Sequence, residues 1–179
     1  AFKDDTFYGV ELENGTEKEY LITIPHSENA VGARVSTNEI GFPSVEGLAN
    51  VEGQLMAVSV DFPAHTTSLI SVDSSTGAGT LIGTGPFDVI IVALAYDPLA
   101  KVLYGAGIPF GGAGGVDDPN LYTINPDTGA MSLVGNLGTT IQGLAWSATK
   151  GLVGTYEHLY EINTSTGAAT QCGSTSYHD

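Results

Sequence analysis

Basic residues, cysteine and long apolar runs are all scarce in this sequence, and each shortage excludes a class of protein. The chain of 179 residues holds only five Lys and Arg, and these are scattered. They cannot form a positive patch, so neither nucleic acid nor a membrane surface is expected as a partner. No apolar run approaches the ~20 residues that a membrane-spanning helix needs, so a soluble chain is expected. The single Cys172 cannot form an intrachain disulfide, and we expect it to be a small buried hydrophobe.

The composition nevertheless predicts a folded protein. Apolar residues make up 42% of the chain and charged residues only 14%, although the net charge is −15. That balance excludes an acidic disordered tail, and the length fits one compact domain. The 24 glycines and the spread of β-branched residues favour short strands joined by tight turns. A neutral or cationic partner suits so acidic a chain.

An internal repeat is the strongest signal in the sequence. Residues Leu121–Gly135 match Leu69–Gly83, and a third copy runs from Leu159 to Thr170. Each copy alternates apolar and polar residues, meets an Asn or Asp, turns through Thr-Gly and resumes as a second strand. This pattern is typical of a β-hairpin, in which the Asx side chain opens the turn and glycine supplies the positive φ.

A second hairpin alternates with the first. Its strands contain Gly-Leu-Ala or Ala-Leu-Ala around Ala49, Ala95 and Ala145, and the start of the chain aligns with them at Ala1. The alanines therefore recur at intervals of roughly 46 to 50 residues. Small residues suit strands that crowd around a central axis, so we expect these to be the innermost strands.

Two hairpins per repeat make four strands, which is the composition of a β-propeller blade. The sequence therefore predicts an all-β fold: one propeller domain of about four four-stranded antiparallel blades, approximately 1–48, 49–94, 95–144 and 145–179. Blade 1 diverges most, because Glu19–Ile24 supplies its third strand but a longer connection through Pro25 replaces the Thr-Gly turn.

The repeat resembles a family of bacterial propeller repeats with the pattern Gly-Leu-Ala-x-Asp-Pro, Leu-Tyr-Gly, Leu-Tyr-x-Ile-Asp-x-x-Thr-Gly and Leu-x-Gly. The resemblance covers nearly the whole chain. Proteins with such repeats mostly have no assigned activity, so the resemblance implies a fold and very little about function.

Two assemblies are compatible with four blades. The blades can close alone, or two chains can pair through their terminal blades into an eight-bladed ring, which makes the protein a homodimer. Closure removes unpaired strand edges, which otherwise promote aggregation, so an open arc of four blades is disfavoured.

Candidate ligand-binding residues come from the loops between the second and third strand of each blade, which gather on one rim of a propeller. The longest of these loops is the insertion Ile108–Asn120, with an aromatic residue before a glycine run and an acidic pair after it. The candidates are Asp61, Phe62, His65, Phe110, Asp117, Asp118, Glu157 and His158. An aromatic contact beside acids suits a small sugar or a basic peptide.

The sequence shows no catalytic or metal motif. Asp117, Asp118 and Asn120 offer oxygen ligands for calcium but do not match an EF-hand, and a zinc site from His65 and His158 needs distant loops to converge. We therefore expect no cofactor or metal. The leading hypothesis is a non-enzymatic binding or protein-interaction module. The alternatives are a propeller hydrolase or lyase that uses rim acids, histidines and a divalent metal, and a structural fragment of a larger surface protein. The compartment stays open, with a secreted or cell-surface bacterial protein as one reading.

Overall fold

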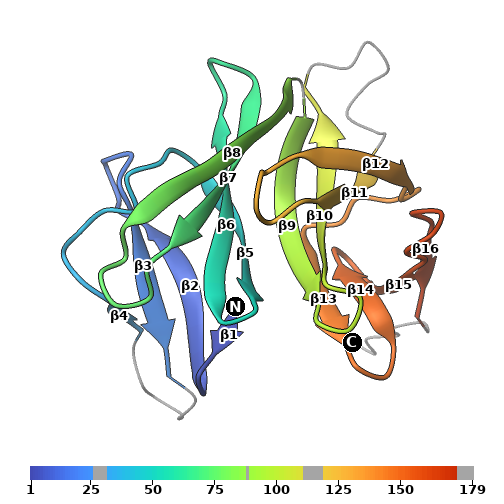
Figure 1. Ribbon diagram of the computed structural model, residues 1–179, viewed down its shortest axis with the longest axis horizontal. Coiled ribbons are helices and arrows are strands. Elements are labelled where there is room, and N and C mark those ends of the chain that lie inside the picture. The colour runs from blue at the N-terminus through green and yellow to red at the C-terminus, as the bar shows by residue number, and fades with distance from the viewer. Residues whose placement is uncertain (26–31, 88, 111–118, 173–179) are drawn as a thin grey trace, which may run out of the picture.

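The computed structural model describes residues 1–25, 32–87, 89–110 and 119–172. These residues form four small antiparallel sheets of four strands each, arranged as a four-bladed β-propeller (Figure 1). No helix occurs among them, and so none that could cross a membrane. The predicted all-β propeller is confirmed.

Within each blade the strands follow chain order from the inside outward. Blade 1 contains β1 (Phe2–Lys3), β2 (Thr6–Leu12), β3 (Glu19–Ile24) and β4 (Ala33–Arg34). Blade 2 contains β5 (Val45–Val51), β6 (Gln54–Asp61), β7 (Thr66–Val72) and β8 (Gly79–Phe87). Blade 3 contains β9 (Val89–Asp97), β10 (Val102–Pro109), β11 (Asn120–Ile124) and β12 (Met131–Asn136). Blade 4 contains β13 (Gly143–Ser147), β14 (Gly151–Thr155), β15 (Leu159–Ile162) and β16 (Ala169–Gln171).

The turn between the third and fourth strands is held by an Asx side chain and a glycine with positive φ, as the sequence predicted. In blade 3 the Asn125 Oδ1 accepts the backbone N–H groups of Asp127 and Thr128, at 2.9 and 3.1 Å. Gly129 then adopts a φ of 70°, a left-handed conformation that glycine reaches without strain. Blade 4 repeats this geometry from Asn163 to Gly167.

Three buried apolar clusters hold the blades together, one at each joint between consecutive blades. They lie between blades 1 and 2, blades 2 and 3, and blades 3 and 4. The repeat alanines Ala49 and Ala95 are buried in the second and third of these joints, whereas Ala145 is exposed. No corresponding cluster joins blade 4 to blade 1 in the described part of the chain.

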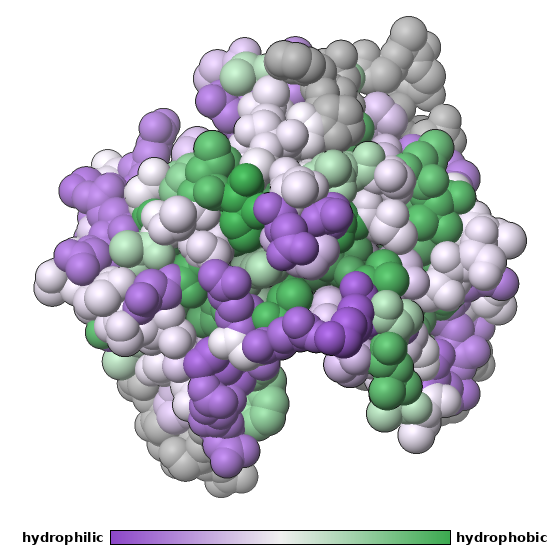
Figure 2. Space-filling model, in the orientation of Figure 1, coloured by the Kyte–Doolittle hydropathy of each residue, from purple (hydrophilic) through white to green (hydrophobic). Residues whose placement is uncertain are grey.

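Outside these joints the surface is mixed. On the face shown in Figure 2, hydrophobic residues form separate groups among hydrophilic ones, and the lower edge of the molecule is hollowed.

Candidate functional site

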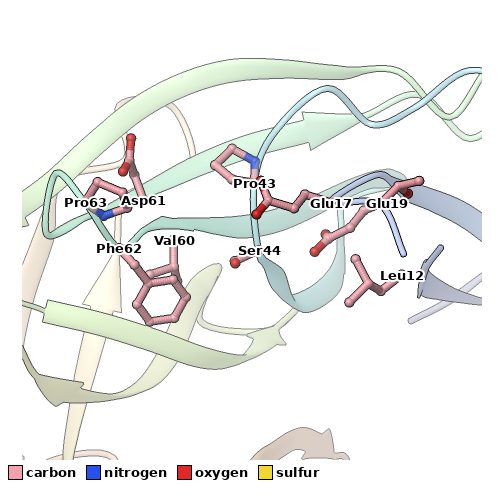
Figure 3. Close-up of a pocket in the computed structure, with 10 residues that line it drawn as sticks. Leu12, Glu17, Glu19, Pro43, Ser44, Val60, Asp61, Phe62 and Pro63 are labelled. Atoms are coloured by element: carbon pink, nitrogen blue, oxygen red, sulfur yellow. The ribbon is translucent and has the colours of Figure 1, made fainter. Parts of the chain in front are cut away.

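A cavity of about 410 Å³ opens between the rim loops of blades 1 and 2. Its walls come from the end of β2 and the loop to β3, from the Pro43-Ser44 segment that enters β5, and from the end of β6 and the loop to β7. Figure 3 shows Val60 and Phe62 on one side of the cavity and Leu12, Glu17 and Glu19 on the other, with Pro43 and Ser44 between them. The cavity thus combines apolar walls with a few carboxylates, as binding sites for small molecules commonly do.

Glu19 is the most deeply buried acid of the cavity, with 8% of its surface exposed. Its Oε2 accepts the backbone N–H of Val45 at 2.6 Å, which fixes the carboxylate where the chain enters blade 2. Burial is the main reason that the pKa of Glu19 lies above its ordinary range. The hydrogen bond from Val45 partly offsets this rise in pKa, and the charge of Glu46 adds to it.

The loop between β6 and β7 is shaped by its own side chains. The Oδ1 of Asp61 accepts the N–H of Ala64 at 2.9 Å, which closes a turn over Phe62 and Pro63. His65 completes the reversal with a φ of 54°. The turn leaves the ring of Phe62 half exposed at the rim, where it lines the cavity.

Phe62 also belongs to an aromatic cluster that spans blades 2 and 3. Its ring meets that of Phe110 edge-on, with centroids 5.8 Å apart. Phe110, which follows β10, stacks on the imidazole of His65 at 4.7 Å with an interplanar angle of 5°. Three predicted residues from two loops therefore meet on the rim, and Phe62 links their cluster to the cavity.

Two predicted residues of blade 4 do not join this cluster. Glu157 and His158 lie in the loop between β14 and β15 of blade 4, where the His158 ring packs against Tyr160 with centroids 6.3 Å apart. Asp117 and Asp118 lie outside the described residues, as does most of the insertion that contains them.

The basic residues of blade 1 are engaged by acids other than Glu19. Arg34 donates to Glu11 at 2.6 Å and to Glu13 at 3.1 Å, and its guanidinium lies 3.7 Å from the ring centroid of Tyr20. Lys18 pairs with Glu39. None of the described residues that line the cavity is basic, so its carboxylates give this part of the rim a negative character.

Within the described ranges, no group of three or more His, Cys, Asp or Glu side chains is placed to hold a metal ion. The zinc arrangement considered from sequence needs His65 and His158 together. The structure places these histidines in different blades, with ring contacts to Phe110 and Tyr160 respectively.

Sequence reasoning did not identify Leu12, Glu17 or Glu19 as site residues. Glu19 begins a strand whose next residues, Tyr20 and Leu21, are buried in the propeller. The sequence did offer one sign of a buried acid, since Glu19 directly precedes an apolar strand. A glutamate at a solvent-exposed strand end would give the same sequence pattern, so this sign does not identify a site.

The molecule is therefore a four-bladed β-propeller with an acidic cavity and an aromatic cluster on one rim. No protein-family model matches the chain, and no curated protein sequence matches it. Its fold is similar to that of a structural-genomics protein of unknown function from Bacteroides thetaiotaomicron, with a TM-score of 0.59 and 17% sequence identity over 94% of this chain. It is also similar to TolB from Acinetobacter baumannii, with a TM-score of 0.55 and 14% identity over 93% of this chain. The chain spans 41% and 40% of the lengths of these two proteins, and at such identities the similarity shows the fold alone.

Proposed function

We propose that this propeller is a non-enzymatic binding module that takes a small neutral or cationic ligand, such as a sugar or a short basic peptide, at the rim of blades 1 to 3. The observation that carries the proposal is the continuity of the cavity with the aromatic cluster through Phe62.

The chemistry of the walls supports this class of ligand. Leu12, Val60 and Phe62 offer apolar contact to the body of a ligand. The carboxylates of Glu17 and Glu19 accept hydrogen bonds from hydroxyl or ammonium groups. An aromatic ring half exposed beside acids suits a sugar face or the side chain of a basic residue, whereas an anionic ligand is repelled.

The proposal is tested by screening sugars and short Lys- or Arg-containing peptides against the purified chain, with chemical-shift changes and thermal shift as readouts. For a ligand found in this way, Phe62→Ala and Glu19→Gln each should weaken binding about tenfold or more, because each removes a central contact. Leu99→Ala is the matched control, since this highly exposed side chain lies in the turn between β9 and β10, at the opposite end of β10 from Phe110. Binding that survives both rim variants would place the site elsewhere and overturn the proposal.

For a cationic ligand, the affinity should also depend on pH. Because the pKa of Glu19 is raised, its carboxylate loses its charge on acidification before an ordinary glutamate does. Affinity for a cationic peptide should therefore fall as the pH drops through this raised pKa, and Glu19→Gln should remove that part of the pH dependence.

A metal-dependent enzyme is the alternative to be separated from this proposal. Binding of an ion to the native state alone would raise the melting temperature. A binding module without metal should show no thermal shift with calcium or zinc, and a shift with either ion would favour the metal-dependent reading.

A further inference from the structure

The inner strands of blades 2 and 3 receive the same backbone contact from the preceding blade. Val45 of β5 and Ile91 of β9 occupy one repeat position, four residues before the repeat alanines. The N–H of Val45 is accepted by Oε2 of Glu19 at 2.6 Å, and that of Ile91 by Oγ1 of Thr67 at 3.3 Å. Glu19 and Thr67 are equivalent too, because each lies two residues before a buried leucine of the third strand. A neutral hydroxyl in blade 2 thus makes the contact that a carboxylate makes in blade 1.

The charge of Glu19 is therefore not required for packing one blade on the next. The Thr67 hydroxyl also donates to the carbonyl oxygen of Val89, at 2.6 Å. At the joint between blades 1 and 2 the equivalent carbonyl oxygen, that of Pro43, accepts the Ser59 hydroxyl at 2.5 Å. Both backbone groups of this joint have partners, and a neutral oxygen acceptor in place of the Glu19 carboxylate would complete the contact equally well.

One carboxylate oxygen of Glu19 is available to a ligand. Among the described residues Val45 is the only donor to this carboxylate, through Oε2, and Glu19 lines the cavity. Burial raises the pKa of Glu19, because its charge is poorly solvated there. A ligand hydroxyl can donate to Oε1 but leaves the charge unbalanced, whereas a cation supplies both the hydrogen bond and the opposite charge. The buried acid thus favours a cation over a neutral ligand.

The other walls of the cavity favour an organic cation over a metal ion. Glu17 and Asp61 also line the cavity, but no three acidic, His or Cys side chains of the described residues are placed to hold one ion. Across the cavity from Glu19 lie Val60 and Phe62 (Figure 3). Their apolar side chains give a metal ion no ligand, but they can bury the carbon body of an amine.

We infer that the cavity binds an organic ammonium group, with its N–H donors on the Glu19 carboxylate and its carbon body against Val60 and Phe62. This assignment rests on the proposed binding function, which it narrows from neutral or cationic ligands to amines. A free amine and a lysine side chain in a peptide offer the same chemistry, since each places an ammonium group at the end of an apolar chain.

Titration calorimetry with matched probes at neutral pH tests this ligand class. Phenethylamine and phenethyl alcohol share one carbon body and differ in carrying an ammonium or a hydroxyl group. The wild type should bind the amine about tenfold more tightly than the alcohol, because a hydrogen bond to a charged group is the stronger one. Acetyl-lysine methylamide and its Nε-acetylated form repeat the comparison for a peptide side chain, and together the two pairs show whether a free amine or a lysine is preferred.

Variants at Glu19 assign the preference to its charge. Glu19→Gln keeps an oxygen acceptor for Val45 and should lower the affinity for phenethylamine about tenfold, to that for phenethyl alcohol. Glu19→Thr places the residue type of blade 2 at this position and should do the same, and it replaces Glu19→Gln if thermal unfolding shows that variant to be unfolded. Asp127→Asn is the matched control, since it removes one negative charge from an exposed side chain of blade 3 and should bind phenethylamine as the wild type does.

The outcomes separate the ligand class from the binding function itself. If a sugar from the ligand screen binds the wild type and the amine probes do not, the amine assignment is overturned while the binding function is retained. An affinity for phenethylamine that the neutral variants at Glu19 leave unchanged also overturns the assignment. If no sugar, amine or peptide binds, both proposals are overturned.

Discussion

At the scale of single residues, the turn between the third and fourth strands forms equally with a charged residue, Asp73 in blade 2, and with neutral asparagines in blades 3 and 4. The Oδ1 of Asp73 accepts the N–H groups of Ser75 and Thr76 and the Ser75 hydroxyl, at 2.8, 2.8 and 2.6 Å. These hydrogen bonds lower the pKa of Asp73 to about 2. Blades 3 and 4 place neutral Asn125 and Asn163 at the same position and retain the backbone contacts. The turn therefore needs an oxygen acceptor rather than a charge.

Replacing Asp73 with asparagine should preserve the fold and change its response to acid. The folded-state pKa of Asp73 lies below the ordinary value of ~3.9, so the carboxylate contributes stability above that value and loses it as the pH falls towards 2. Asp73→Asn should lack this loss when unfolding is measured by denaturant titration from pH 5 to pH 2. Asp127→Asn is the matched control, because its side chain stands beside an equivalent turn without accepting the capping hydrogen bonds. If Asp73→Asn and wild type lost the same free energy of unfolding on acidification, Asp73 would not be the group responsible.

Glu19 should produce the opposite pH dependence. Its folded-state pKa is raised, mainly by burial, so the folded state holds the proton more tightly than the unfolded chain does. Relative to Glu19→Gln, the wild type should be most stable below the ordinary glutamate pKa of ~4.3. It should lose stability as the pH rises from there through the raised value. Denaturant unfolding of both proteins between pH 3 and pH 8 measures this difference, and a constant difference would show that Glu19 is not the group responsible.

At the scale of elements, one glycine in the outer strand of a blade lets that strand lie close to the turn of the next blade. A Cβ added to Gly83 of β8 would lie 1.9 Å from the carbonyl oxygen of Thr128, in the blade 3 turn. A Cβ added to Gly135 of β12 would lie 2.1 Å from the carbonyl oxygen of Thr166, in the blade 4 turn. The final glycine of the repeat pattern thus serves a contact between blades, which the pattern alone does not reveal.

Alanine at either of these glycines should therefore loosen a joint between blades. Gly83→Ala and Gly135→Ala should each destabilise the protein by about 1–3 kcal/mol, because backbone must move to admit the methyl group. Urea unfolding measures the change, and Thr80→Ala, at an exposed position of the same strand as Gly83, is the control. Unchanged stability in both glycine variants would mean that the blades pack less closely than the structure indicates.

At the scale of the whole molecule, the excess of acids acts against the compact state. The net charge is −15, and the described basic residues of blade 1 are already paired with nearby acids. Self-repulsion of this size destabilises a folded chain, and added salt screens it over distances beyond about 10 Å at 0.1 M.

The melting temperature should consequently rise as NaCl is increased from low to moderate concentration. Differential scanning calorimetry provides the measurement. A melting temperature that falls with salt would indicate that attractive ion pairs, not repulsion, dominate the surface electrostatics.

The sequence alone determined the strands, the turns and their grouping into blades, because these depend on residues close together along the chain. Alternation of apolar and polar residues encodes a strand, and the pattern Asx-x-x-Thr-Gly encodes its turn through hydrogen bonds that reach two or three residues. The same reasoning placed Phe62, His65 and Phe110 on rim loops that the structure brings into contact.

Only the tertiary structure decided which residues face a cavity and which apolar side chains of the repeat are buried. Glu19 becomes a buried acid because the chain folds Val45 against it from the next blade, and no local pattern records that approach. Ile24 and Leu159 follow the same apolar pattern as their buried equivalents. Ile24 and Leu159 are 45% and 44% exposed, whereas Val72 and Leu69 at the equivalent positions of blade 2 are buried, because burial depends on which surfaces meet in space and not on the pattern within one strand.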